Sequence, residues 1–189
     1  MDALGLVETR TIVQGVKAMD KMLKAAPVAL VKGTGICSGR YMIQVAGFQA
    51  DVEEALVRAK DEEPFPVDVR ILSRVSSQVL AALKKQASLP RESAMGVVES
   101  RRAIAGIAAA DAAVKQADVI LARLTVANGI NGKSYLVLGG NVAAVEEGVE
   151  AAGLALGKDL VDRLVLPSPD SSTIRALCPL DPCAGCKEI

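Results

Sequence analysis

The chain has 189 residues, and 22 Lys and Arg balance 22 Asp and Glu, so no strong field exists to recruit nucleic acid or an anionic membrane. Two Phe, two Tyr and no Trp leave few rings for base stacking, and charged residues interrupt every apolar segment before it reaches membrane-spanning length. The absence of His excludes Ser-His and Cys-His catalysis and every histidine-containing metal site.

The apolar pattern predicts a small α+β unit in the first half of the chain. Ile12, Val16, Met19, Leu23 and Ala26 recur at helical spacing, and short apolar runs on either side of this segment are typical of strands. The predicted elements, in chain order, are a strand at 3–8, a helix at 12–26, strands at 28–32 and 41–47, a helix at 52–59, a strand at 67–72 and a helix at 76–85. The order β-α-β-β-α-β is the split arrangement of ferredoxin-like folds, which predicts a four-stranded antiparallel sheet covered by helices.

The chain then repeats itself. Residues 3–32 and 94–123 match at a constant offset of 91, with 12 identical positions among 30. A period of this length indicates two copies of a whole domain rather than a solenoid. We therefore predict a duplicated α+β protein, whose segments are a first domain at 1–83, a linker at 84–93, a second domain at 94–177 and a cysteine-rich tail at 178–189.

Both copies resemble a known family. The pattern "G-x-V-E-T…A-x-D-x-x-x-K-A-A…V", followed by a glycine-rich hairpin, is similar to the shell-protein domain (BMC domain) of bacterial microcompartments, and "GVVES…AADAAVKQADV" carries it again. Two such domains in one chain resemble the tandem shell proteins that form pseudohexameric homotrimers. The resemblance implies a structural, non-enzymatic protein located in a microcompartment shell in the cytoplasm, and it implies other shell proteins as partners.

A lone cysteine in the first hairpin is the main candidate site. Cys37 lies in "GTGICSGRY", where glycines on both sides predict a tight turn. A cysteine in this loop is similar to the propanediol-utilisation type of tandem shell protein, whose family role is to hold a 4Fe–4S cluster on the three-fold axis. The resemblance implies one cluster per trimer, used for electron transfer or gated transport, with encapsulated or cytosolic redox enzymes as further partners. The pore-loop residues that it implies are Gly35, Ser38, Gly39, Asn131 and Gly132.

The resemblance also gives a meaning to a duplicated lysine. In these shells the lysine of "DxxxKxA" lies at the edge of the tile, where it pairs with its neighbour across a local two-fold, and Lys24 and Lys115 fill that position. Without the resemblance, both would be interpreted as part of a solvated helix face. An arginine after the fourth strand often covers the same edge; Arg74 matches it, whereas the second copy has Ser168 there.

The tail adds three more thiols. Cys178, Cys183 and Cys186 follow the spacing C-x4-C-x2-C, which matches the first three ligands of plant-type ferredoxins. Three interpretations remain open: a second iron–sulfur or zinc site, a cluster of thiols that tethers an enzyme, and a disordered end without a role. In a further variant, Cys37 joins the three tail cysteines as ligands of one intrachain site.

Two other function classes compete with a shell protein. One is a cytosolic regulatory module that binds a small ligand between duplicated ferredoxin-like domains, and the other is a soluble ferredoxin-like electron carrier. Glu8 and Glu99 occupy equivalent places at the ends of strands, so we interpret them as structural caps of the helices that follow rather than as catalytic carboxylates. No nucleophile–base pair can be named, and we predict that the protein is not an enzyme.

Overall fold

The computed structural model describes residues 2–61, 63–84, 94–127 and 129–178. The chain forms two compact units, which combine segments of both sequence repeats. The first unit contains the chain up to Val75 together with Ser100–Ala108 and Val126–Ser134, and the second unit contains the remainder. Apart from Lys84, the predicted linker at 84–93 lies outside the described residues.

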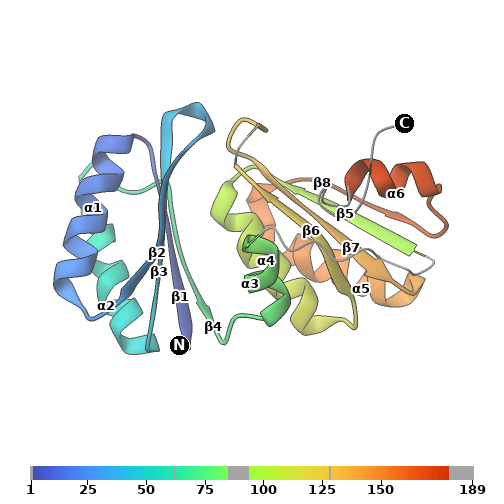
Figure 1. Cartoon of the computed structure of the whole chain (residues 1–189), viewed down its shortest axis with the longest axis horizontal. Coiled ribbons are helices and arrows are strands. Elements are labelled where there is room, and N and C mark those ends of the chain that lie inside the picture. The colour runs from blue at the N-terminus through green and yellow to red at the C-terminus, as the bar shows by residue number, and fades with distance from the viewer. Residues whose placement is uncertain (1, 62, 85–93, 128, 179–189) are drawn as a thin grey trace, which may run out of the picture. The chain divides into compact units, whose positions relative to one another are not determined.

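The first sheet confirms the predicted ferredoxin-like order. The elements of the first repeat are β1 (Ala3–Thr9), α1 (Ile12–Ala25), β2 (Ala29–Ile36), β3 (Arg40–Gly47), α2 (Gln49–Lys60) and β4 (Asp68–Ser73). The strands are arranged in the order β2-β3-β1-β4, and β1 runs antiparallel to both of its neighbours. Helices α1 and α2 lie side by side on one face of this sheet (Figure 1).

The second repeat builds the same arrangement. After the short helix α3 (Ser77–Leu83), its elements are β5 (Ala94–Ser100), α4 (Ala103–Gln116), β6 (Ile120–Val126), β7 (Ser134–Gly140), α5 (Val142–Leu156), β8 (Leu160–Leu166) and α6 (Ser171–Leu177). The strand order is β6-β7-β5-β8, which matches the first sheet position for position. The fold class is therefore α+β with two four-stranded sheets, as the sequence predicted.

Small and branched side chains form the core between the first sheet and its helices. Val7 and Ile43 from the strands pack with Ala18 and Met22 from α1, and all four are fully buried. At the start of α1, the side chain of Thr11 accepts a hydrogen bond from the backbone N–H of Gln14, which satisfies one of the unpaired donors of the first turn. The β-α-β connection is thus fixed both by its cap and by its buried face.

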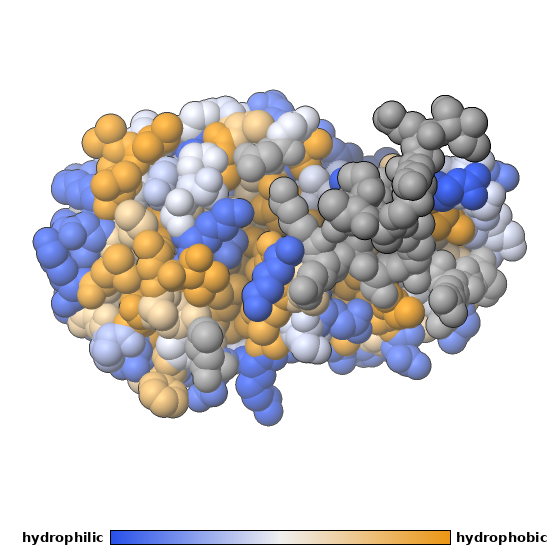
Figure 2. Space-filling view, viewed as in Figure 1, coloured by the Kyte–Doolittle hydropathy of each residue, from blue (hydrophilic) through white to orange (hydrophobic). Residues whose placement is uncertain are grey.

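The buried face of α1 differs from the face that the apolar spacing predicted. Ile12, Val16 and Leu23 are 51%, 47% and 36% exposed. The residues that α1 buries are Gln14, Gly15, Ala18 and Met22. Gly15 and Ala18 let α1 approach the sheet closely, whereas Ile12, Val16 and Leu23 remain on the surface. Figure 2 shows hydrophobic atoms gathered over the side of the molecule where Figure 1 draws α1.

Gly15 offers a direct test of this close approach. A Cβ at Gly15 would lie 2.5 Å from the Cβ of Tyr41, so Gly15→Ala should lower the free energy of unfolding by about 1–3 kcal/mol through overpacking, although alanine favours a helix. Urea unfolding measures the effect. Gly35→Ala is the matched control, because its Cβ would meet only the Cδ1 of Ile12, at 3.8 Å. Equal stability of both variants would mean that Tyr41 moves aside without cost.

Candidate functional site

The cysteine loop is a tight turn between two strands. Cys37, Ser38 and Gly39 form the short connection that links β2 to β3. Ser38 and Gly39 both have a φ of 71°, in the left-handed region where a residue with a side chain is uncommon. The glycines around Cys37 predicted such a turn, and the structure confirms it. The turn leaves the Cys37 side chain partly exposed.

The second repeat has an equivalent turn between β6 and β7. Asn131 and Gly132 also have positive φ angles, of 55° and 72°, and they take the places of Ser38 and Gly39. Leu30 and Leu121 are 91 positions apart, whereas Gly39 and Gly132 are 93 apart, so the second turn is two residues longer. Ile130 consequently stands where the first turn has Cys37. The two turns thus share a pair of left-handed residues and differ in their side chains. We expect such a difference where duplicated loops have diverged in function.

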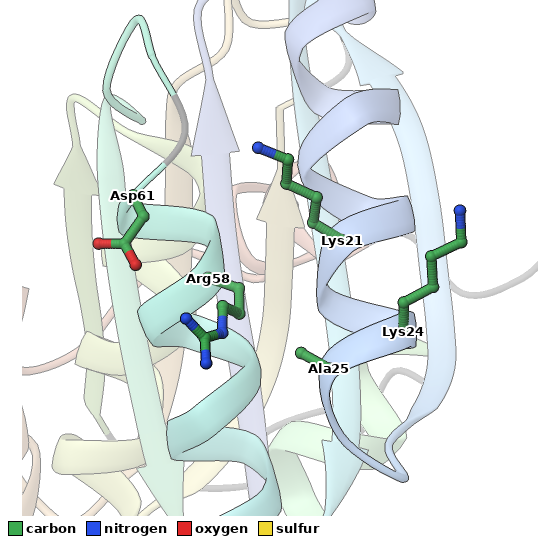
Figure 3. Close-up of a pocket in the computed structure, with 5 residues that line it drawn as sticks. All are labelled: Lys21, Lys24, Ala25, Arg58 and Asp61. Atoms are coloured by element: carbon green, nitrogen blue, oxygen red, sulfur yellow. The ribbon is translucent and has the colours of Figure 1, made fainter.

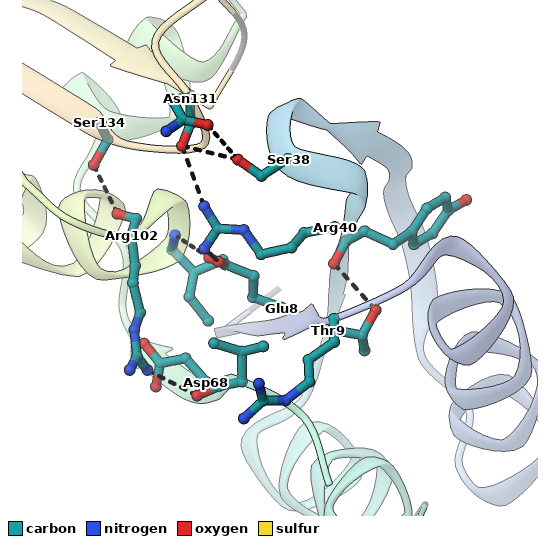
Figure 4. Close-up of polar contacts among 12 residues, drawn as sticks. Glu8, Thr9, Ser38, Arg40, Asp68, Arg102, Asn131 and Ser134 are labelled. Atoms are coloured by element: carbon teal, nitrogen blue, oxygen red, sulfur yellow. Dashed lines mark hydrogen bonds and ion pairs between the residues drawn. The ribbon is translucent and has the colours of Figure 1, made fainter. Parts of the chain in front are cut away.

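The two turns meet within the first unit. The hydroxyl of Ser38 donates a hydrogen bond to the side-chain oxygen of Asn131 and lies 3.3 Å from its backbone carbonyl oxygen (Figure 4). A Cβ on Gly132 would displace the guanidinium of Arg40 and lie 3.1 Å from the carbonyl oxygen of Cys37, and the φ of 72° also favours glycine there. Of the predicted pore-loop residues, the structure therefore brings Ser38, Asn131 and Gly132 together. Gly39 lies in the same turn, and Gly35 precedes it near the end of β2.

Backbone amides surround the sulfur of Cys37. The N–H of Gly129 donates to Sγ at an N···S distance of 3.2 Å. This hydrogen bond lowers the pKa of the Cys37 thiol, and the N–H groups of Ile130, Asn131 and Gly132 act in the same direction. The thiolate, rather than the thiol, binds metals and acts as a nucleophile. The second turn thus favours the form of Cys37 that could serve as a ligand.

A buried ion pair supports these turns from below. The carboxylate of Glu8 is completely buried at the end of β1, and it accepts a hydrogen bond from Nη1 of Arg40. Nη2 of the same guanidinium lies 3.4 Å from the carbonyl oxygen of Asn131, and the backbone N–H of Ile104 lies 3.5 Å from the other oxygen of Glu8 (Figure 4). Burial raises the pKa of Glu8, and the positive charge of Arg40 opposes that increase. One carboxylate therefore connects β1, β3 and the start of α4.

The role predicted for Glu8 was wrong in its detail. Thr11, not Glu8, caps α1, whereas Glu8 faces the first turn of α4 in the other repeat. A carboxylate at that place still interacts favourably with the unpaired N–H groups of a helix start. Sequence reasoning missed Arg40 altogether, although this residue follows the cysteine turn directly. The charge of Arg40 points to an ion pair only when the burial of Glu8 is known.

The predicted shell-edge residues lie on exposed elements. Lys24 is 75% exposed in its side chain and forms an ion pair with Asp20 one turn earlier, at 2.6 Å. Lys115 pairs in the same way with Asp111, so the duplicated motif gives the same local contact twice. Arg74 follows β4 with a φ of 50°, and its side chain is exposed.

A shallow depression lies next to Lys24, between α1 and α2. Figure 3 shows its lining: Lys21, Lys24, Ala25, Arg58 and Asp61. Arg58 forms an ion pair with Glu54, and Lys24 is paired with Asp20, so neither cation needs a ligand for neutralisation. The depression therefore adds no second candidate site to the cysteine turn.

Only the first tail cysteine lies within the described residues. Cys178 follows α6 directly and is 1% exposed, packed with Met95, Ala122 and Val137, and this burial raises its thiol pKa. Cys183 and Cys186 lie outside the described residues, so the tail metal site and the joint site with Cys37 remain predictions. Within the described part of the chain, no three potential metal-binding side chains gather in one place. The same residues include no helix long and apolar enough to span a bilayer.

Comparison with known proteins gives a consistent result. The family model described as the BMC domain matches twice, at residues 3–72 and 94–169. The chain is 35% identical over 178 residues to the bacterial microcompartment shell protein PduT of Citrobacter freundii, covering 93% of this chain and 97% of that protein. It is 30% identical to the carboxysome assembly protein CcmO of a Synechocystis strain, covering 78% of this chain and 54% of that protein.

A solved structure agrees with these relatives. The crystal structure of a microcompartment protein from Desulfitobacterium hafniense DCB matches with a TM-score of 0.79 and 36% sequence identity. The match covers 93% of this chain and 99% of the other. The sequence similarity and the fold similarity thus extend over the same two repeats.

The ion pair under the turns gives the next testable prediction. Arg40→Met leaves the carboxylate of Glu8 buried without its partner, so it should lower the free energy of unfolding by about 3–5 kcal/mol. The double variant Glu8→Gln/Arg40→Met removes the charge as well and should recover much of that loss. Urea unfolding at fixed pH measures both variants.

The pH dependence of unfolding gives an independent check. The folded-state pKa of Glu8 is raised, so its protonated form stabilises the fold below the ordinary carboxyl value of 4.5, and this contribution is lost as the pH rises through the raised pKa. Removing Arg40 raises that pKa further, so Arg40→Met should lose stability with rising pH more steeply than the wild type. The double variant should not. Parallel pH profiles of all three proteins would contradict a buried charge at Glu8.

Proposed function

Since the chain belongs to the bacterial microcompartment shell proteins, with two BMC domains in tandem, we propose that it forms a pseudohexameric homotrimer with a 4Fe–4S cluster at its centre. Its relatives are structural shell proteins, and assembly with other shell proteins follows from the family. The proposal adds three things to the family membership: the homotrimer, the cluster and electron transfer through the shell. The observation that carries it is the Cys37 sulfur, which sits at a turn and receives the N–H of Gly129.

The exposed start of α1 supports the trimer. In the first unit, the start of α4 is buried, and Ile104 is completely covered beside Glu8. The corresponding residues of α1, at an offset of 91, are Ile12, Val13 and Val16, and they are 51%, 79% and 47% exposed. Exposed apolar side chains at three equivalent places indicate a surface that another protein covers.

A second copy of the chain fits that surface best. The second repeat carries Glu99 at the place of Glu8, so its sheet offers α1 of a neighbouring chain the kind of contact that the first sheet makes with α4. Such a head-to-tail contact uses different surfaces on the two partners, and it forms a closed ring if the rotation between chains permits. Three chains would place six similar domains around one axis, which is the arrangement that the family resemblance implies.

The residues of the cysteine turn fit an iron–sulfur cluster. Cluster irons are bound mainly by cysteine thiolates, and hydrogen bonds to the sulfurs tune their potential. One chain offers one such thiolate, with a depressed pKa and an amide donor already in place, and three chains would offer three. The fourth iron would then take a ligand other than cysteine. Such a group supplies one-electron transfer, so redox enzymes on either side of the shell are the partners that this proposal requires.

The edge residues give the proposal its first test. If the protein is a shell tile, its exposed Lys24 and Lys115 contact neighbouring tiles, and Arg74 lies at the same edge. Changing both lysines to Glu should abolish the extended sheets seen by electron microscopy, because each new carboxylate would repel Asp20 or Asp111 one turn earlier and so leave its place at the edge, while the trimer remains folded. Lys17→Glu is the matched control on another exposed position of α1. If the wild type stops at a small closed oligomer, the regulatory-module alternative is favoured.

Iron content tests the cluster. Anaerobically purified protein should contain about four iron atoms per trimer rather than four per chain. Cys37→Ser should remove the broad visible absorbance and the signal of the reduced protein in electron paramagnetic resonance, because a hydroxyl is a poor ligand for a soft metal. Native mass spectrometry should still give a trimer. A full iron complement in Cys37→Ser would place the metal in the tail, and truncation after Leu177 would then remove it.

A further inference from the structure

A short helix of the first repeat is seated on elements of the second repeat within the second unit. The N–H of Ser76, just before α3, donates to Oδ1 of Asp111 on α4 at 2.8 Å. Nε2 of Gln78 donates to the carbonyl oxygen of Val119 at 3.0 Å, and the N–H of Leu121 donates to Oε1 of Gln78 at 2.7 Å. The side-chain amide of Gln78 thus pairs with the backbone along the edge strand β6, as a neighbouring strand would.

Residues on both sides of these hydrogen bonds are also buried. On α3, Val79 is completely buried and Ala82 is 8% exposed. On the other side, Leu121 and Asp111 are each 3% exposed. We call Asp111, Val119 and Leu121 the occupied seat, because α3 covers them. The buried carboxylate of Asp111 has two partners, the N–H of Ser76 on the incoming segment and the ammonium group of Lys115 on its own helix.

The first repeat carries the same seat, and no helix among the described residues covers it. At an offset of 91, its members are Asp20, Val28 and Leu30, which we call the open seat. Leu30 is 43% exposed, against 3% for Leu121, and the side chain of Asp20 is 59% exposed, against 5% for Asp111. The two seats therefore differ in coverage rather than in sequence.

The matching helix is α6, which follows the second repeat as α3 follows the first. Asp170 caps α6 through the N–H of Ser172, just as Ser76 caps α3 through the N–H of Gln78. Counted from these caps, Thr173 and Ala176 take the places of Val79 and Ala82. Both are exposed, although their counterparts on α3 are buried.

The opposite side of α6 already has its own partners. Ile174 and Leu177 pack against the buried cluster that contains Met95 and Val137. An outward side with Thr173 and Ala176 therefore remains for another surface. Figure 1 shows α6 beside the second sheet and the exposed strand β2 at the edge of the first.

We propose that α6 of one chain occupies the open seat of a second copy of the same chain. The occupied seat supplies the template, and the contact passes from the second repeat of one chain to the first repeat of the next, head to tail. This inference rests on the proposed trimer and names one contact that holds it together. Ser172 takes the place of Gln78 and reaches less far, so the apolar side chains carry more of this contact than in the occupied seat.

Cross-linking tests the contact directly. We would introduce Leu30→Cys and Ser172→Cys into a chain in which Cys37, Cys183 and Cys186 are replaced by Ser; the buried Cys178 is kept. A short bis-maleimide should then give covalent dimers and trimers on a denaturing gel. The control pair, Lys60→Cys with Ser172→Cys, uses another exposed position, outside the open seat, and should give monomers only. Ladders from both pairs, or from neither, would overturn the proposed contact.

Arginine substitutions on α6 provide the second measurement. Thr173→Arg should raise the dissociation constant of the trimer about tenfold or more in analytical ultracentrifugation, because an arginine does not fit where Val79 is buried in the template. Its thermal unfolding as a monomer should stay unchanged, since Thr173 is exposed within one chain. Ser171→Arg, next to it on α6, should leave the trimer intact, because its counterpart Ser77 is exposed. A stable Thr173→Arg trimer would contradict the inference alone, whereas a monomeric wild type would contradict the proposed function.

Discussion

The arrangement around Cys37 depends on one carboxylate that has no access to water. A buried charge of this kind is tolerated only when a partner neutralises it, and Arg40 does so while its other nitrogen reaches toward Asn131. Because Arg40 begins the strand that follows the cysteine turn, the pairing fixes the base of that turn against the sheet. The N–H of Ile104 satisfies the remaining oxygen of Glu8, so the start of α4 is held at the same point. The position of the thiol is thus a consequence of how a glutamate is buried.

The two repeats share this framework and differ at the turns that surround Cys37. Both turns contain two consecutive left-handed residues, although the second turn is two residues longer and has further positive φ angles at Ala127 and Gly129. The first turn carries a thiol, and the second supplies amide hydrogens to it through Gly129 and its neighbours. Neither turn alone supplies both the thiol and the amide donor that hydrogen-bonds to it. The division of labour explains why a duplicated domain retains two turns that look dissimilar in sequence.

The sequence predicted the elements, the antiparallel sheets and the tight turn, because periodicity and glycine placement are local properties. It did not predict which face of α1 is buried, since Ile12 and Val16 are as apolar as core residues and only tertiary packing distinguishes them. The partner of Glu8 was equally hidden, because Arg40 is 32 positions away and no spacing rule connects the two. Cys178 was grouped with the tail by its spacing, although the structure buries it against the second sheet.

Ile130 stands at the place of Cys37, so each chain carries one turn with a thiol and one turn without. A shell made of separate single-domain chains, some with a thiol and some without, would assemble with whatever ratio the cell happened to express. Covalent fusion of one thiol-bearing turn to one thiol-free turn makes their numbers equal in every assembly of this chain, independent of expression level. Because both turns are encoded in one reading frame, their ratio does not depend on how two transcripts are regulated. A substitution at Cys37 therefore changes half of the turns in an assembly and leaves the other half unchanged.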